Sequence, residues 1–100
     1  MSIKAFDTAV SGMRLASTKL AASAHNVANL VTEDFARTQA SGVEAKDGGV
    51  NVELSTASVP GPDLVADVIE QKVAAVVYRA NLQVVKTTDA LLGDLLNTRG

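Results

Sequence analysis

The chain has 100 residues, of which 47% are hydrophobic, 20% charged and 3% aromatic, so it is long enough for one small domain. Nine basic and eleven acidic residues give a net charge of −2, and this balance, with only three aromatic side chains, argues against a nucleic-acid-binding protein. The absence of cysteine excludes disulfide bonds, thiolate metal sites and cysteine nucleophiles.

No segment of the sequence has the length and apolarity of a membrane span. The longest uninterrupted apolar run, residues 73–78, is far shorter than the roughly 20 residues that a span requires. The opening residues, Met1–Lys4, lack the basic, apolar and small-residue regions of a secretory signal. We therefore expect neither direct membrane insertion nor a cleaved signal peptide.

The first segment, residues 1–31, has the pattern of an amphipathic helix. Apolar residues recur at alternating steps of three and four from Ile3 to Val31, and the only interruption is Ser17. This pattern predicts a helix from about Ser2 to about Leu30, with a narrow seam for one partner helix. The seam residues that we expect to contact that partner are Phe6, Val10, Met13, Leu20 and Val27.

The middle segment, residues 32–61, has the composition of a region without helix, because it holds four of the seven glycines. Val43 and Ala45 precede the turn sequence Lys46–Gly49, and apolar residues then alternate with polar ones at Val50, Val52 and Leu54. An Asp-Gly-Gly turn between two alternating runs predicts a β-hairpin.

The last segment, residues 62–98, again predicts a helix. Pro62 suits a first helical turn, and the positive end of the helix dipole favours Asp63 and Asp67. Many β-branched residues lower its intrinsic stability, so this helix needs packing partners. The residues that we expect to pack against the first helix are Val73, Val76, Ala80, Val84, Leu91 and Leu95.

These segments predict a mainly α fold: a single elongated domain over 1–100, in which two long antiparallel helices form a coiled-coil hairpin with a short β-hairpin and loops between them. Helices of about 40 and 50 Å exceed the roughly 26 Å diameter of a compact chain of this size. Apolar residues just off the seam stay partly exposed in such a hairpin, and such surface usually marks an association face.

The sequence offers no convergent set of catalytic or metal-binding residues. His25 is the only histidine, and Glu33 and Asp34 are neighbours on a loop, where adjacent side chains point apart. Ser11 and Ser41 lack the flanking pattern of a nucleophile elbow. We expect no catalytic, cofactor-binding or metal-binding residues, and hence no enzymatic activity.

Two motifs, one near each end of the chain, carry a resemblance to a known family. The stretch from Ser23 to Phe35 resembles the end of the N-terminal helix of the bacterial flagellar rod and hook proteins, a pattern like N-x-A-N-x-x-T-x-G-F. The stretch from Tyr78 to Leu92 is similar to that family's C-terminal helix, roughly Y-x-A-N-x-x-V-x-x-T-x-D-x-x-L. The matching residues are Asn26, Ala28, Asn29, Thr32 and Phe35 in the first motif, and Tyr78, Asn81, Thr87 and Asp89 in the second.

The resemblance implies a structural subunit of the flagellar basal-body rod, which self-assembles through its paired terminal helices into a helical tube. It also implies export through the flagellar type III apparatus without a cleaved signal, and a place in the periplasm-spanning rod. The implied partners are other copies of the chain, other flagellar axial proteins and the export apparatus, with no nucleic acid and no cofactor.

The chain departs from the family pattern at three places. The Pro-Gly that usually precedes the Phe is Glu33-Asp34 here, which predicts a looser or differently shaped turn. Val76-Val77 replaces the usual Gln-Arg before Tyr78 and makes that face more apolar. The large middle domains of hook and distal-rod members are missing, so the chain resembles a short, proximal-rod-like member.

Three other readings of the sequence stay open. One is a small secreted helical-hairpin protein, which would normally have a Trp-x-Gly bend where this chain has a β-hairpin and no tryptophan. Another is a cytoplasmic coiled-coil adaptor or export chaperone. An enzyme is the third, and a loss of turnover on mutation of His25 would support it.

Overall fold

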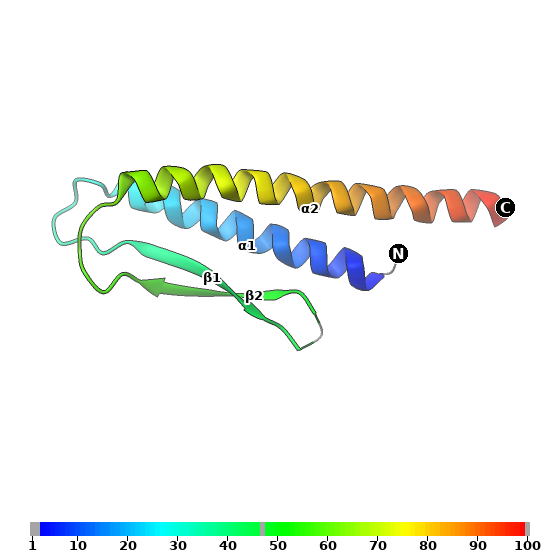
Figure 1. Ribbon diagram of the computed structural model, residues 1–100, viewed down its shortest axis with the longest axis horizontal. Coiled ribbons are helices and arrows are strands. Elements are labelled where there is room, and N and C mark those ends of the chain that lie inside the picture. Colours follow the sequence, from blue (N-terminus) through cyan, green and yellow to red (C-terminus); the bar gives the residue numbers. More distant parts are fainter. Residues whose placement is uncertain (1–2, 47, 100) are drawn as a thin grey trace.

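The computed structural model describes residues 3–46 and 48–99, and these form two helices with a two-stranded sheet between them (Figure 1). Helix α1 spans Ile3–Ala28, strand β1 Thr38–Glu44, strand β2 Val50–Thr56 and helix α2 Leu64–Arg99. The two helices run antiparallel and side by side, which confirms the predicted helix–hairpin–helix layout. The molecule measures 63 × 25 × 14 Å, so the predicted elongated shape is confirmed as well.

The helix ends differ from the predicted ones by two residues. Helix α1 ends at Ala28 rather than near Leu30, because the chain then turns through successive hydrogen bonds from Leu30 N to Val27 O and from Thr32 N to Asn29 O. Helix α2 begins at Leu64 rather than at Pro62. Ser2, the predicted start of the first helix, lies outside the described residues.

Asp63 is the N-cap of α2. Its carboxylate Oδ1 accepts a hydrogen bond of 3.1 Å from the backbone N–H of Ala66, three residues further on. Aspartate is among the residues that best satisfy the free N–H groups of a first turn, and its charge also suits the positive end of the helix dipole. Pro62 therefore precedes the cap instead of opening the helix.

The β-hairpin packs along α1, on the side opposite α2 (Figure 1). Its strands pair antiparallel from Thr38 with Thr56 to Glu44 with Val50. The positive φ angles of Gly48 (89°) and Gly49 (78°) fit the predicted turn, of which Asp47 lies outside the described residues. Strand β1 starts at Thr38, five residues before Val43, the first residue of the predicted run. The sequence did not predict this part of the strand because Thr38–Gly42 has no alternating apolar pattern.

Two close contacts seat the hairpin on α1. The hydroxyl of Ser11 donates a hydrogen bond to the backbone carbonyl of Thr8 and accepts one from the backbone N–H of Val50, at 2.8 and 3.1 Å. A Cβ on Gly42 would lie 2.7 Å from a terminal methyl carbon of Leu15, so a larger residue here would require the Leu15 side chain to move.

The helices meet through small side chains instead of the predicted large ones. The buried positions of α1 follow a seven-residue repeat at Ala9, Ala16 and Ser23, and those of α2 follow the same repeat at Asp67, Ala74 and Thr88. Gly12 lies against Asn81, and a Cβ placed on Gly12 would be only 2.8 Å from the Asn81 amide nitrogen. We call these residues the small-residue seam: Ala9, Gly12, Ala16 and Ser23 of α1, and Ala74, Asn81 and Thr88 of α2.

The predicted helix-pairing residues are not among the buried ones in the described part of the chain. On average they lie about 80° around each helix from the centre of the seam, and single positions lie about 30–140° from it, at 100° per residue. In α1 the exposed or half-buried residues are Phe6 (36% exposed), Leu20 (42%), Val10, Met13 and Val27. In α2 all of the predicted residues are exposed: Val73, Val76, Ala80, Val84, Leu91 and Leu95.

The small-residue seam predicts that volume, not hydrophobicity, limits the pairing of the helices. Replacing Ala16 by Leu should force the helices apart and cost about 1–3 kcal/mol of unfolding free energy. Replacing the exposed Leu20 by Ala should cost less than about 1 kcal/mol. Urea denaturation of both variants, at a concentration where the chain is monomeric, tests this order. A greater loss for Leu20→Ala than for Ala16→Leu would show that the large side chains hold the helices together.

Candidate functional site

A buried polar cluster joins the end of α1 to the start of α2. The Asn26 side chain forms a pair of hydrogen bonds with the backbone of Thr38: its Oδ1 accepts from the N–H at 2.7 Å and its Nδ2 donates to the carbonyl at 2.9 Å. The same Nδ2 donates to Asp67 Oδ1 at 3.1 Å. Arg37 donates to both carboxylate oxygens of Asp67, from Nε at 3.2 Å and from Nη2 at 2.5 Å. We call these four residues the polar joint.

The charge balance of the polar joint keeps Asp67 ionised. Burial, which leaves Asp67 only 1% exposed, would by itself raise the pKa of its carboxyl. The hydrogen bonds from Arg37 and Asn26 and the charge of Arg37 outweigh this effect and lower the pKa below its ordinary value of 3.8. The hydrogen bond to Asp67 also raises the pKa of Arg37. The pair therefore remains charged throughout the physiological pH range.

The family-motif residues of the first motif lie in and beside the polar joint. Asn26 is its centre. Asn29 caps the end of α1, since its Nδ2 donates to the His25 carbonyl at 2.9 Å, and its Oδ1 accepts from the Thr32 hydroxyl at 3.1 Å. The ring of Phe35 folds back edge-on to His25, with 5.3 Å between the ring centres.

The turn that leads to Phe35 contains a residue in a strained backbone conformation. Asp34 has φ = +60°, the left-handed region, and it stands where the family pattern has glycine. The chain therefore adopts a glycine-like conformation at this position without glycine. After the turn, Phe35 and Arg37 accept backbone hydrogen bonds from Gly61 and Ala57, which hold the two loops together.

The second motif lies along α2. Asn81 donates from Nδ2 to the Val77 carbonyl at 3.0 Å and faces Gly12 across the seam, so the upstream part of the first helix and the second motif meet there. Thr87 and Asp89 are exposed, as is Ala28 at the end of α1. Tyr78 is 39% exposed and lies beside a groove.

This groove runs between α1 and α2 and consists of two adjoining hollows of about 340 and 570 Å³, which share Ser17 and Tyr78. We call it the Tyr78 groove. Its first hollow is lined by Val10, Met13, Arg14, Ser17, Tyr78 and Val85. Its second is lined by Ala16, Ser17, Leu20, Ala74, Ala75, Tyr78 and Arg79.

A third hollow, of about 460 Å³, lies over the polar joint and is lined mainly by polar side chains from α1, the hairpin and α2. At its edge Lys19 and Glu70 form an ion pair of 3.6 Å, in which both side chains are about one-third exposed or more. In the part of the chain that the structure describes, every buried side-chain nitrogen and oxygen has a hydrogen-bond partner. The polar joint is thus internally satisfied and acts as a structural connection.

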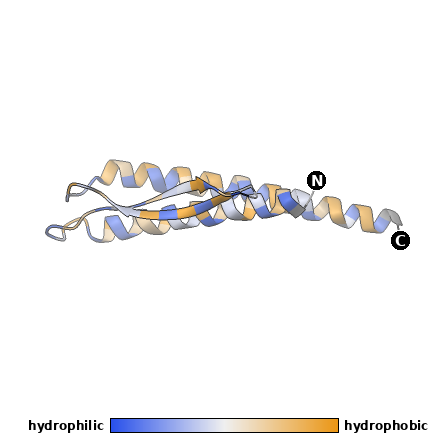
Figure 2. Ribbon diagram, turned by 90° about the horizontal axis from the view of Figure 1, so that it is seen from below, coloured by the Kyte–Doolittle hydropathy of each residue, from blue (hydrophilic) through white to orange (hydrophobic). Residues whose placement is uncertain are grey.

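The described residues contain no cluster of three histidines or carboxylates that could hold a metal ion. Among the same residues, neither helix has a stretch long and apolar enough to cross a bilayer. What the surface offers instead is apolar side chains along both helices, and hydrophobic segments recur along the whole of α2 (Figure 2). An arrangement of this kind can bind another protein surface.

Sequence reasoning missed Arg37, Thr38 and the pairing of Asp67. Arg37 and Asp67 are thirty residues apart, and nothing in their local patterns connects them. The small-residue seam did leave a signal, the seven-residue spacing of Ala9, Ala16 and Ser23, but the stronger periodicity of the larger side chains concealed it.

Comparison with protein-family models gives no match, and comparison with curated proteins gives none.

The polar joint predicts an acid-dependent stability. Because the pKa of Asp67 is lower in the folded chain, its contribution is full above the ordinary value of 3.8 and is lost as the pH falls toward the folded value. Asp67→Asn should lower the free energy of unfolding by about 3 kcal/mol at neutral pH, and this deficit should shrink below pH 3.8. Thermal unfolding followed by circular dichroism from pH 2 to 7 measures both effects.

The matched control is Asp63→Asn, which makes the same charge change at the same helix end. Asparagine caps a helix about as well as aspartate, so this variant should stay close to the parent chain. Equal losses in the two variants would mean that the helix dipole, and not the ion pair with Arg37, accounts for the effect.

The left-handed Asp34 predicts a stabilising substitution. Asp34→Gly should raise the free energy of unfolding by up to about 1 kcal/mol, because glycine adopts positive φ without steric cost. Glu33→Gly, next to it, should lower it, since among the described non-glycine residues only Asp34 has positive φ. Chemical denaturation of both variants checks the opposite signs, and a decrease for both would rule out strain at Asp34.

Proposed function

We propose that the chain is a structural subunit of the bacterial flagellar basal-body rod, which assembles through its helix pair into a helical tube. The observation that carries the proposal is that nearly all the large apolar side chains of α2, and Phe6 and Leu20 of α1, are exposed in the single chain. Two family-motif residues support it, because Asn26 is the centre of the polar joint and Asn81 lies against Gly12, and these contacts help to fix how the two terminal helices pair.

The energetics of the isolated chain favour association. The fully buried apolar side chains among the described residues are all alanines: Ala9, Ala16, Ala22 and Ala74. Each exposed Val or Leu side chain gains about 1.5–3 kcal/mol when it is fully buried. Neighbouring subunits can supply this burial, which one chain alone leaves unused.

The exposed apolar residues of α2 form a continuous strip for such neighbours. Its residues recur at intervals of three or four positions and so share one side of the helix, and their exposed fractions include 56% for Ile69, 53% for Val73 and 58% for Val76. The hairpin does not cover this side, because it packs on α1 only. We call these residues the α2 strip: Ile69, Val73, Val76, Ala80 and Val84.

Heterologous contacts between such surfaces generate helical assemblies, because they need not close into a ring. In this proposal the subunit reaches the rod through the flagellar type III export apparatus, and its partners are other copies and other axial proteins. A small alanine core is compatible with that route, since it costs little free energy to unfold for export.

The α2 strip predicts an assembly-defective variant. Val73→Asp with Val76→Asp should raise the concentration required for polymerisation at least about 100-fold, because each buried unpaired carboxylate costs several kcal/mol. Sedimentation velocity and electron microscopy of the purified chain measure this. Asn51→Asp with Ser58→Asp, which adds the same two charges at exposed polar positions outside α2, is the control and should assemble normally. Normal polymerisation of the double variant would contradict assembly through the strip.

The location in the rod has its own test. A tagged copy, expressed in the bacterium whose genome encodes the protein, should co-purify with detergent-extracted basal bodies, and deletion of the gene should abolish motility. Recovery of the tagged protein only in the soluble cell fraction, with motility intact after deletion, would contradict a role in the rod.

A further inference from the structure

Helix α2 extends past the end of α1 and leaves an unpaired helical segment. Gly12 faces Asn81, and from this point α1 continues for nine residues to Ile3, whereas α2 continues for eighteen residues to Arg99. The difference of nine residues corresponds to about 14 Å of helix, and Figure 1 shows the C-terminal end of α2 beyond the N-terminus. Thr88 is the last buried position. We call residues 91–97 the overhang.

The overhang carries four exposed leucines in two consecutive turns. Leu91 and Leu92 are 42% and 45% exposed, and Leu95 and Leu96, one turn later, are 61% and 70% exposed. A lone helical turn with this much apolar surface gains free energy when it packs on another surface. Because α2 is one uninterrupted helix, the overhang points away from its own chain's Tyr78 groove and cannot fold back into it.

The Tyr78 groove matches the overhang in spacing. Its first hollow is bounded on α1 by Val10, Met13 and Ser17, and its second by Ser17 and Leu20, so the two hollows follow one another at about one helical turn. The two leucine pairs of the overhang also follow one another at one turn, or about 6 Å. Each hollow, at about 340 and 570 Å³, has room for the side chains of one pair.

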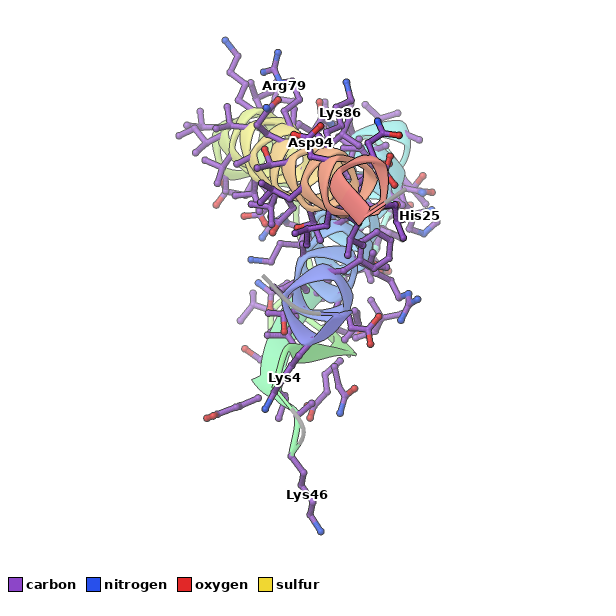
Figure 3. The ribbon with its side chains drawn as sticks, turned by 90° about the vertical axis from the view of Figure 1, so that its right-hand side faces the viewer. Lys4, His25, Lys46, Arg79, Lys86 and Asp94 are labelled. Carbon is purple, nitrogen blue, oxygen red and sulfur yellow. The ribbon has the colours of Figure 1, made fainter. Side chains whose placement is uncertain are left out.

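The charges are complementary as well. The charged residues that line the groove are both basic, Arg14 and Arg79, and Figure 3 shows Arg79 projecting outward from α2. The described charged side chains at this end of α2 are both acidic, Asp89 just before the overhang and Asp94 within it. Opposite charges at the edge of an apolar contact favour one orientation of the partner and increase the rate of encounter.

We propose that the overhang of one copy docks in the Tyr78 groove of the next copy, head to tail. This inference rests on the proposed assembly function and names the contact that orders successive subunits. The overhang and the groove are different surfaces of the chain, so each bound copy presents a free overhang or a free groove to another, and the series need not close into a ring.

Such a contact is weak in isolation. The surface area that four leucines and the rim of a groove can bury is smaller than the roughly 800 Å² per partner that a stable complex buries. The test therefore uses covalent capture, for which the natural absence of cysteine is an advantage. Ser17→Cys places a thiol at the junction of the two hollows, and Leu92→Cys places one in the overhang; both positions are exposed.

The two single-cysteine chains, distinguishable by a tag, are mixed and treated with a short bis-maleimide. The groove–overhang pair should give at least about ten times more mixed dimer than a control pair in which Lys46→Cys replaces Ser17→Cys. Lys46 is exposed at the tip of the hairpin, on the side of α1 opposite α2 (Figure 3). Arg14→Glu in the Ser17→Cys chain should reduce the mixed dimer several-fold, since it reverses the charge at the groove.

The outcomes separate this contact from the proposed function. Equal yields for the groove pair and the control pair, while the unmodified chain polymerises, overturn the contact and leave assembly intact. Dimers joined mainly through two Leu92→Cys chains indicate a symmetric tail-to-tail contact and overturn the head-to-tail arrangement. Absence of both polymer and mixed dimer overturns the contact and self-assembly together.

Discussion

The close approach of α1 and α2 through small side chains determines the rest of the structure. Ala16 and Ala74 are each 2% exposed, and Gly12 leaves no room for a Cβ against Asn81. Helices that meet through such residues lie near the short end of the usual 8–10 Å range of axis separations. Large side chains cannot enter so narrow a seam, and they are displaced to its flanks, where they border the Tyr78 groove and form the α2 strip.

The polar joint fixes the geometry of the chain at one end of the helix pair α1–α2. Asn26 binds both backbone groups of Thr38, and the charge of Arg37 compensates the burial of Asp67. Replacement of a buried ion pair by apolar residues is often neutral or stabilising, so stability alone is a weak explanation for such a pair. Its geometry does fix where the chain leaves α1 and enters α2, and it thereby selects the register in which the small-residue seam forms.

The two helices and the hairpin could be predicted because each has its own periodicity, of three to four residues for Ile3–Ala28 and two for Val50–Leu54. The contact between the helices could not. Hydrophobic periodicity points to the largest side chains, whereas α1 has two neighbours, the hairpin and α2, and its most buried residues are small. The pairing of Arg37 with Asp67 depends on the tertiary fold, and the positive φ of Asp34 could not be predicted from its residue type.

Because the buried apolar residues of the described chain are all alanines, unfolding of a single chain exposes little apolar surface. The heat-capacity change and the denaturant m-value of unfolding both scale with the apolar surface that becomes exposed, and Ala9, Ala16, Ala22 and Ala74 contribute little of it. A lone chain should therefore melt over a broad interval, with shallow curvature in its stability against temperature. The large negative heat-capacity change that usually accompanies folding should appear instead when chains associate, so calorimetry would register the ordering of this protein chiefly as a binding event.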